Sequence, residues 1–437
     1  MLDYPGITQK CVGSRCEAFF LEFVMSDNLE LFDFPKFKIT QKIRLIELFG
    51  GIGSQAIALR DIGADFEHYR LVEFDKYAIA SYNSIHGTHF EPSDIKNIHG
   101  VDLGITKKDK YCYLLTYSFP CQDLSVAGKH KGMKKGDNTR SGLLWEVERI
   151  LNELNQEDLP QVLLMENVPQ VHAEANMLDY EAWLSFLRSK GYHNFWKDLN
   201  AKDYGIPQNR DRCFCVSVLS ESFVDYQFPK SVKLEKVMKD FLEKDVEEKY
   251  YINNEKSKKL IEQLVKDGVI GTENIEKTKQ DDSVLDCEFY KKAIETAIKE
   301  NAQLGDIVDA FNGKVRKDGI CPTITTRPEG KKTAILPCVK AKTTRGSDIV
   351  STIRSSYYKN GERNIAENVK NVMGYEGVIQ NYRIRKLTPR ECWRLMGYSD
   401  SDFDKAQKVN SNTQLYRQAG NAIVKQVLMA IFKQMGA

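Results

Sequence analysis

Residues 45–53 read Leu-Ile-Glu-Leu-Phe-Gly-Gly-Ile-Gly, an apolar run that ends in a glycine-rich turn. An amphipathic stretch, residues 54–62, follows the turn directly. A strand that turns through glycines into a helix is typical of an α/β unit, because glycine lets the backbone turn tightly and approach a ligand closely. We therefore expect an α/β domain to begin near residue 43, with a ligand at the end of its first strand.

Short apolar strands alternate with helical stretches from this point to residue 218. The predicted strands are 43–49, 69–73, 113–117, 162–165 and 213–218, and the predicted helices are 76–84, 143–154 and 180–190. This alternation predicts a doubly wound sheet covered by helices on both faces. Ligands of such sheets bind at the carboxyl ends of the strands, where Phe49, Glu73, Cys121 and Glu166 all fall.

The rest of the chain shows other patterns. Residues 232–302 carry helical apolar spacing in a charged background, whereas 305–382 indicates strands and loops rich in Thr, Arg and Gly. Helices are expected at 390–396 and 421–435, the second rejoining the first domain. We predict an N-terminal extension (1–40), an α/β domain (41–224), a smaller inserted region (225–382) and a C-terminal segment returning to the α/β domain (383–437). Either Met1 or Met25 fits as the start.

Composition indicates a globular protein of the cytoplasm. The chain has 437 residues, 42% hydrophobic and 28% charged. No apolar run reaches the roughly 18 residues of a membrane helix, and the short stretch 18–25 lacks the features of a signal peptide. The ten cysteines show no disulfide or zinc spacing, so we expect a reducing compartment and no metal.

The net charge of +2 hides a segregation within the inserted region. Residues 221–309 hold 15 Lys/Arg against 21 Asp/Glu, a net charge of −6, whereas 314–390 hold 17 against 6, a net charge of +11. A solvated charged face is the usual reason for such a bias. Because the basic part is also rich in turns, a surface that faces phosphate is the better interpretation.

Four further motifs accompany the glycine turn. Residues 118–122, Ser-Phe-Pro-Cys-Gln, present Cys121 where a strand ends, although a free cysteine is more often buried and structural. Residues 165–168, Met-Glu-Asn-Val, end a strand with a carboxylate. Residues 208–212, Gln-Asn-Arg-Asp-Arg, place two guanidinium groups just before a strand, and 418–422, Gln-Ala-Gly-Asn-Ala, are expected to open the last helix.

In this order, the five motifs resemble those of the cytosine-C5 DNA methyltransferases of bacterial or phage type, over about residues 43–435. The resemblance implies an S-adenosylmethionine-dependent methyltransferase sheet with an inserted target-recognition region. It implies the cofactor contacts Phe49, Gly51, Gly53, Glu73, Phe74, Asp94, Pro120, Leu143 and Asn421. Glu73 would bind the ribose hydroxyls, Phe74 would stack on adenine, and Asp94 would bind the adenine amino group. Phe74 stands where many relatives carry Trp.

The predicted catalytic residues are Cys121, Glu166, Arg210 and Arg212. Cytosine C5 is a weak nucleophile, and addition of a thiolate to C6 would convert the ring to an enamine whose C5 can accept a methyl group. Glu166, if protonated, can donate to N3, while Arg212 can hold O2 with support from Arg210. The alternatives are a capping or surface carboxylate for Glu166 and a solvated loop for the arginines.

Duplex DNA is the expected partner, with the target base flipped into the pocket. The loop after Cys121, with Gln122, Ser125 and Lys129, is expected to contact DNA and to close over the base. In the basic region, Thr325, Thr326 and Arg327 are the candidates for reading bases, although an ordinary surface strand fits each of them nearly as well. We expect a monomer, with a restriction endonuclease as a possible separate partner and no membrane.

Three other functions compete with this interpretation. An RNA cytosine-C5 methyltransferase would share the core, but the large basic insertion favours DNA. A catalytically inactive DNA-binding repressor is disfavoured by the intact Cys121, Glu166 and Arg212. A nicotinamide dehydrogenase would need the third glycine of its fingerprint, where this chain has Ala56. The chain also lacks an Asp/Asn-Pro-Pro-Tyr type motif, which argues against methylation of amino groups.

Overall fold

The computed structural model describes ten internal stretches and the C-terminal one: residues 36–121, 123–124, 132–136, 139–250, 299, 307–309, 314–316, 334–335, 350–351, 375–380 and 383–437. All six predicted DNA contacts lie outside these residues, namely Gln122, Ser125, Lys129, Thr325, Thr326 and Arg327. The N-terminal extension up to residue 35 also lies outside them.

A six-stranded sheet forms the centre of the molecule, in the order β2-β1-β3-β4-β7-β5. The strands are β1 (Lys42–Leu48), β2 (Phe66–Val72), β3 (Tyr111–Tyr117), β4 (Val162–Asn167), β5 (Tyr192–Asn200) and β7 (Asp211–Leu219). The first four pair in parallel, whereas β7 is antiparallel to both β4 and β5. The predicted, mostly parallel α/β sheet is therefore confirmed, with one reversed strand and an additional strand, β5, that we did not predict.

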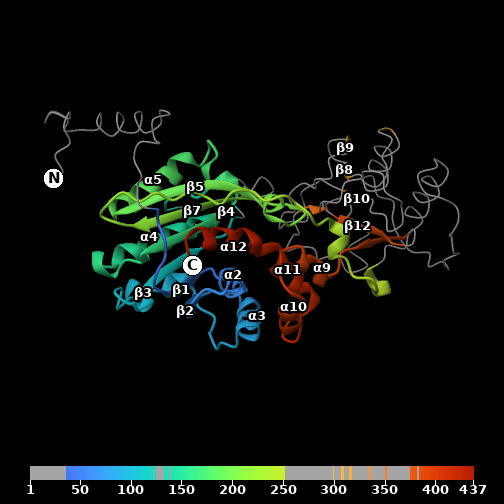
Figure 1. The fold of residues 1–437 in the computed structure, drawn as a ribbon, viewed down its shortest axis with the longest axis horizontal. Helices are drawn as coiled ribbons and strands as arrows, with labels where there is room; N and C mark the ends of the chain where they lie inside the picture. Colours follow the sequence, from blue (N-terminus) through green and yellow to red (C-terminus); the bar gives the residue numbers. More distant parts are fainter. Residues whose placement is uncertain are drawn as a thin grey trace.

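Apolar side chains point alternately to the two faces of the sheet, as the twofold period of a strand dictates. In β1, Ile43 and Leu45 pack in one hydrophobic core, while Ile46 and Leu48 pack in the other. Three helices cover the first face, α2 (Ser54–Ile62), α3 (Lys76–His86) and α12 (Lys425–Gln434), and two cover the second, α4 (Leu144–Glu153) and α5 (Met177–Ser189). Figure 1 shows α2 and α12 side by side although they lie far apart in the sequence.

The C-terminal segment contributes α9 (Pro389–Arg394), α10 (Asp400–Gln407) and α11 (Asn412–Asn421) before α12. The prediction that residues 418–422 open the last helix is wrong, because they end α11. Ala422 is extended, with ψ of 164°, and the N–H of Ile423 donates to the hydroxyl of Ser54. These tertiary contacts interrupt the helical pattern between α11 and α12.

A short 3₁₀ helix, η8 (Met238–Phe241), stands where the apolar spacing predicted a longer helix near residues 234–242, and a second, η9 (Glu248–Tyr250), follows it. That prediction is wrong for the described residues, since Met238 and Phe241 pack individually into the first core. Residues 251–302, the remainder of the predicted helical stretch, lie outside the description apart from helical Lys299.

Strands expected between 305 and 382 are present. A second sheet has the order β13-β12-β10-β8-β9, from β8 (Ile307–Asp309), β9 (Lys314–Arg316), β10 (Ala334–Ile335), β12 (Tyr375–Gln380) and β13 (Arg383–Lys386). β11 (Val350–Ser351) pairs in parallel with β6 (Gln208–Asn209), just before Arg210. The remaining 3₁₀ helices are η2 (Ile95–Asn97), η3 (Gly100–Leu103), η4 (Ser141–Leu143), η5 (Gln156–Asp158), η6 (Pro169–His172) and η7 (Ala201–Tyr204).

Candidate active site

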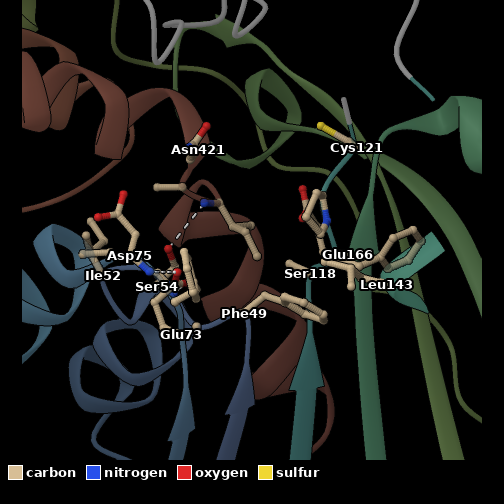
Figure 2. A pocket seen from close by; sticks show the side chains of 18 of the residues that line it. Phe49, Ile52, Ser54, Glu73, Asp75, Ser118, Cys121, Leu143, Glu166 and Asn421 are labelled. Atoms are coloured by element: carbon tan, nitrogen blue, oxygen red, sulfur yellow. Dashed lines mark hydrogen bonds between the residues drawn. The ribbon is translucent and has the colours of Figure 1, made fainter. Parts of the chain in front are cut away.

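A pocket of about 690 Å³ opens at the carboxyl ends of the parallel strands. Figure 2 shows Glu73 on one side, Cys121 and Glu166 on the other, and Phe49 between them. Every predicted catalytic residue lines the pocket, and so does every predicted cofactor residue except Gly53: Phe49, Gly51, Glu73, Phe74, Asp94, Pro120, Cys121, Leu143, Glu166, Arg210, Arg212 and Asn421. The sequence motifs therefore meet in one cavity.

The turn after β1 has an unusual backbone. Phe49, Gly51 and Gly53 all have positive φ, at 57°, 58° and 81°. Such a φ is easy for glycine but uncommon for phenylalanine. Gly53 lies at the N-cap of α2, where an added Cβ would be 2.6 Å from the ring of Tyr82. Gly53 thus lets the turn pack closely on α3, which explains a glycine that does not line the pocket.

Glu73 follows β2 and holds the glycine turn. Its Oε2 accepts a hydrogen bond from the N–H of Gly51 at 2.9 Å, and its Oε1 accepts one from the N–H of Asp75 at 2.8 Å. Burial raises the pKa of this carboxyl group, and the backbone N–H donors oppose that effect. A carboxylate has about four acceptor positions, so it can accept hydroxyl groups of a ligand as well.

Phe74 follows Glu73 directly in the chain, lines the pocket and is 75% exposed. An exposed ring at the rim of a pocket offers a flat apolar face on which a planar base can stack. Asp94 also lines the pocket and caps η2 by accepting from the N–H of Lys96 at 3.0 Å. This end of the pocket thus combines acceptors with a stacking surface.

Cys121 lies directly beyond β3, partly buried and facing the pocket. Burial raises the pKa of its thiol above the usual 9.0, while the positive charges of Arg212 and Arg210 lower it. The thiol is therefore protonated at neutral pH in the free protein. The positive charges of Arg212 and Arg210 nevertheless favour its ionised form.

Glu166 is the penultimate residue of β4 and is paired with Arg212 of β7, with Oε1 and Nε 3.1 Å apart. Both side chains are 11% exposed. Burial raises the pKa of the Glu166 carboxyl group, although Arg212 and Arg210 act in the opposite direction. A carboxyl group whose pKa is raised can hold a proton in a dry pocket and donate it.

Arg210 is 4% exposed and connects the pocket to the end of α11. Its Nη2 donates to the carbonyl of Gly420 at 3.0 Å and to that of Ala422 at 2.7 Å. Burial lowers its pKa to about 9. Its Nε and Nη1 have no hydrogen-bond partner within the described part of the chain, so these donors remain available in a pocket that Arg210 lines.

Two polar residues with no predicted role hold the backbone around Cys121. The amide of Asn167 donates to the carbonyl of Phe119 at 3.0 Å, and the hydroxyl of Ser141 donates to that of Pro120 at 2.7 Å. Ser141 is 21 residues from its acceptor and Asn167 is 48 residues from its own. No local pattern could have revealed these contacts, although Asn167 lies beside Glu166 in the same motif.

One group of potential metal ligands occurs among the residues described. Ligand atoms of His172, Asp198 and Cys213 lie within 4.8 Å of one another. Nε2 of His172 is 3.0 Å from both carboxylate oxygens of Asp198, so these two side chains already form a pair. The absence of a metal stays a prediction.

A family model of C-5 cytosine-specific DNA methylases matches residues 43–437. The chain belongs to this family. The methylase is 30% identical to the type II methyltransferase M2.ScrFI of Lactococcus lactis subsp. cremoris, over 90% of this chain and 99% of the relative. It is 29% identical to the orphan methyltransferase M.SPBetaI of Bacillus phage SPbeta, over 90% and 97% of the two chains.

Among solved structures, the methylase resembles the Entamoeba histolytica methyltransferase EhMeth. The TM-score is 0.56 at 16% identity, with 91% of this chain and 98% of that chain covered. At this identity the likeness shows a shared fold. None of the helices in the described residues is long and apolar enough to cross a membrane.

Membership of the family makes the protein a DNA (cytosine-5-)-methyltransferase, with S-adenosylmethionine as the methyl donor. The dehydrogenase and the amino-group methyltransferase are thereby excluded. The pocket fits this donor, because Glu73 can accept ribose hydroxyls beside the exposed ring of Phe74.

Proposed function

We propose that this methyltransferase modifies C5 of cytosine in a specific duplex DNA sequence, through a covalent adduct between Cys121 and C6 of a flipped base. One observation carries the proposal. Cys121, Glu166 and Arg212 line the same pocket as Glu73 and Phe74, so a nucleophile, a proton donor and the donor-binding groups surround one cavity.

The cycle begins when Cys121 loses its proton and Sγ forms a bond to C6. Negative charge then develops on the ring, where a protonated Glu166 donates to N3 and Arg212 donates to O2. S-adenosylmethionine, when bound, supplies an electrophilic methyl group. After C5 is methylated, loss of the C5 proton breaks the Sγ–C6 bond and regenerates Cys121.

The raised pKa values of Glu166 and Cys121 support these roles. Burial favours the neutral form of both groups, and Arg212 favours the thiolate of Cys121 when the base occupies the pocket. Because C5 and C6 cannot be reached inside a duplex, the base leaves the helix before the adduct forms.

We propose that residues 41–224 and 383–437 form the catalytic domain and that residues 225–382 read the DNA sequence. The +11 charge of residues 314–390 supports this assignment, as does the pairing of β11 with β6 next to Arg210. Gln122, Ser125, Lys129, Thr325, Thr326 and Arg327 stay the proposed DNA contacts. The protein would act in the cytoplasm as a monomer, and a restriction endonuclease could act separately on the same sequence.

Bisulfite sequencing of DNA from expressing cells first identifies the methylated cytosine. The adduct is then tested with a duplex that carries 5-fluorocytosine at that position. The wild type should form a protein–DNA complex that survives denaturation, because fluorine cannot leave as a proton does. Cys121→Ser should bind DNA and S-adenosylmethionine but form no such complex, since a hydroxyl is a much weaker nucleophile near neutral pH.

Cys112→Ser provides the matched control, because Cys112 is buried in β3 and does not line the pocket. It should still be trapped. Methylation of ordinary DNA without any trapped complex would contradict the covalent mechanism. Competition with transfer RNA tests the alternative substrate, because preferential methylation of RNA would replace DNA as the substrate.

A further inference from the structure

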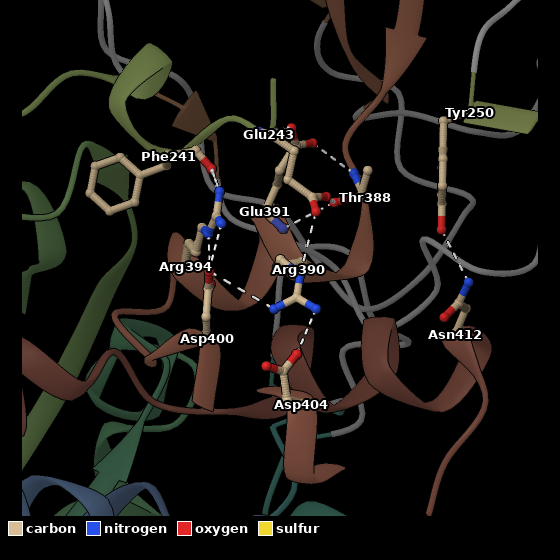
Figure 3. Close-up of polar contacts among 10 residues, drawn as sticks. All are labelled: Phe241, Glu243, Tyr250, Thr388, Arg390, Glu391, Arg394, Asp400, Asp404 and Asn412. Atoms are coloured by element: carbon tan, nitrogen blue, oxygen red, sulfur yellow. Dashed lines mark hydrogen bonds and ion pairs between the residues drawn. The ribbon is translucent and has the colours of Figure 1, made fainter. Parts of the chain in front are cut away.

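The chain leaves for residues 251–386 through the segment 238–250 and returns at Leu387. Figure 3 shows that these two connections meet beside α9 and α10. Tyr250 and Leu387 are both buried. The ends of a stretch that we assign to DNA recognition are therefore fastened at one place.

Glu391 joins the two connections. It is 0% exposed, its Oε1 accepts from the N–H of Glu243 at 2.8 Å, and its Oε2 accepts from the N–H of Thr388 at 2.8 Å. One N–H belongs to the outgoing chain and the other to the returning chain. A buried carboxylate with a hydrogen bond on each oxygen is a strong and directional link.

The side chains form a second link in the same place. The hydroxyl of Thr388 donates to the carboxylate of Glu243, and Nε of Arg390 lies 3.4 Å from the other oxygen of that carboxylate. Arg390 also pairs with Asp404 of α10 at 2.6 Å. The outgoing chain is thus connected to α9 and, through Arg390, to α10.

Helix α11 continues this connection to the pocket. Near its start, Nδ2 of Asn412 donates to the hydroxyl of Tyr250 at 3.0 Å, and the hydroxyl of Tyr416 donates to the carbonyl of Leu387 at 2.6 Å. At its end, Gly420 and Asn421 line the pocket. A single helix therefore contacts both ends of the inserted stretch and the site of chemistry.

We propose that Glu243, Thr388 and Glu391, here called the cross-tie, are positioning residues that fix the orientation of residues 251–386 relative to the pocket. The proposal rests on the function assigned to that region above. None of the three lines the pocket, so their effect falls on productive binding of DNA. Restricting two bodies to one orientation removes an entropic cost that DNA binding would otherwise carry.

Two variants break the side-chain link, and Thr388→Val also removes the hydroxyl that accepts from the N–H of Glu391 at 3.1 Å. Glu243→Ala removes the acceptor, and Thr388→Val removes the hydroxyl. Thr388→Ser keeps the hydroxyl and should restore the wild-type values. Glu247→Ala is the matched control, because Glu247 lies on the same segment with its side chain 68% exposed and pairs with Lys249.

Steady-state kinetics should show KM for DNA raised about five- to tenfold in Glu243→Ala and Thr388→Val, less than the full effect of a lost hydrogen bond to a charged group, because the backbone N–H groups of Glu243 and Thr388 still have Glu391 as their acceptor. The kcat at saturating DNA should stay within about twofold, because the groups at the pocket are unchanged. Calorimetry should give wild-type affinity for S-adenosylmethionine. Unchanged KM in both variants, or an equal loss of cofactor affinity, would overturn the proposal.

Hydrogen exchange separates this proposal from the proposed function, because it needs no DNA. Peptides from 238–250 and 387–394 should exchange faster in Glu243→Ala than in Glu247→Ala, with β1 and β3 unchanged. Equal exchange in the two variants would refute the cross-tie. If the wild type methylated no DNA, the proposed function would fail. Hydrogen exchange in Glu243→Ala and Glu247→Ala would still decide whether the cross-tie exists.

Discussion

At the scale of single residues, Glu166 and Cys121 face opposite demands. Glu166 must be protonated and Cys121 must be ionised, although burial raises the pKa of both groups. The active protonation state is therefore a minor one between the two pKa values. Its population is constant there, because each rise in thiolate with pH is matched by a fall in protonated Glu166.

We predict a flat-topped dependence of kcat/KM for DNA on pH. The acid limb should follow the pKa of Glu166 and lie above the usual Glu value of 4.5. Below that pKa, Glu166 is fully protonated and a further fall in pH only removes thiolate. The basic limb should follow the pKa of Cys121 and lie above the usual Cys value of 9.0. Above that pKa, Cys121 is fully ionised and a further rise in pH only removes the proton of Glu166. Glu166→Gln should reduce kcat and abolish the basic limb, leaving activity to rise with pH. A variant that kept the wild-type basic limb would exclude Glu166 as the titrating acid.

Glu73 has two roles. Its carboxylate accepts hydrogen bonds from the N–H groups of Gly51 and Asp75, and the same carboxylate would accept the ribose hydroxyls of the methyl donor. We predict that Glu73→Gln weakens binding of S-adenosylmethionine by roughly 1.5–3 kcal/mol, because an amide nitrogen cannot accept these hydrogen bonds. Calorimetry measures the effect, and DNA affinity without cofactor should not change.

Glu91→Gln serves as its control, because Glu91 is exposed and does not line the pocket. Wild-type affinity is expected there. If Glu73→Gln also bound with wild-type affinity, Glu73 would have to be removed from the donor site.

Sequence patterns predicted the residues of the pocket better than their partners. Cys121 and Glu166 were predictable because each follows an apolar strand, and such strand ends share one edge of the sheet. The hydrogen-bond acceptors of Arg210 could not be predicted, since Gly420 and Ala422 lie 210 and 212 residues away and offer only backbone carbonyls. A backbone carbonyl has no signature in a sequence.

At the scale of elements, Asp402 fastens α10 to α2. It is 2% exposed and accepts hydrogen bonds from Nη1 and Nη2 of Arg60 at 2.8 and 2.9 Å. Burial acts to raise the pKa of Asp402, but the hydrogen bonds from Arg60 and Ser399 outweigh it and the pKa is lowered. The folded state is therefore stabilised above the unfolded pKa, and this contribution is lost as the pH falls through the folded value.

We predict that Asp402→Asn lowers the free energy of unfolding by about 1–3 kcal/mol at neutral pH, discounted because Arg60 is partly exposed. Urea denaturation followed by tryptophan fluorescence measures the loss. Asp65→Asn is the control, because Asp65 pairs only loosely with Lys42, at 3.6 Å, with its side chain 77% exposed. Equal midpoints for the two variants would show that the pair with Arg60 contributes no stability.

Elements with one strong period were predictable, and those shaped by tertiary contacts were not. Strand β5 carries charged and polar residues at many positions, because it lies at the edge of the sheet next to β7. Its period was too weak to recognise. The orientation of β7 was also hidden, because a buried strand has the same apolar run in either direction.

At the scale of the whole molecule, charge and composition predict an inserted region, but they do not predict how its two ends are attached to the rest of the protein. Residues 314–390 have a net charge of +11 that any reader of the sequence can count. The cross-tie depends on Glu243 and Glu391, two acidic residues 148 positions apart that local patterns would assign to solvent. Burial of Glu391 became evident only with the fold.

The position of α11 in the chain has a consequence for biosynthesis. The glycine turn at residues 49–53 leaves the ribosome before the inserted region, whereas Gly420, Asn421 and Ala422, which line the same pocket, are added only after it. Until they emerge from the exit tunnel, Arg210 lacks both of its carbonyl acceptors and one wall of the pocket is missing. A nascent chain can therefore assemble β1 to β4 yet meet DNA without a competent site, and a premature stop codon before residue 418 would yield the same inactive product.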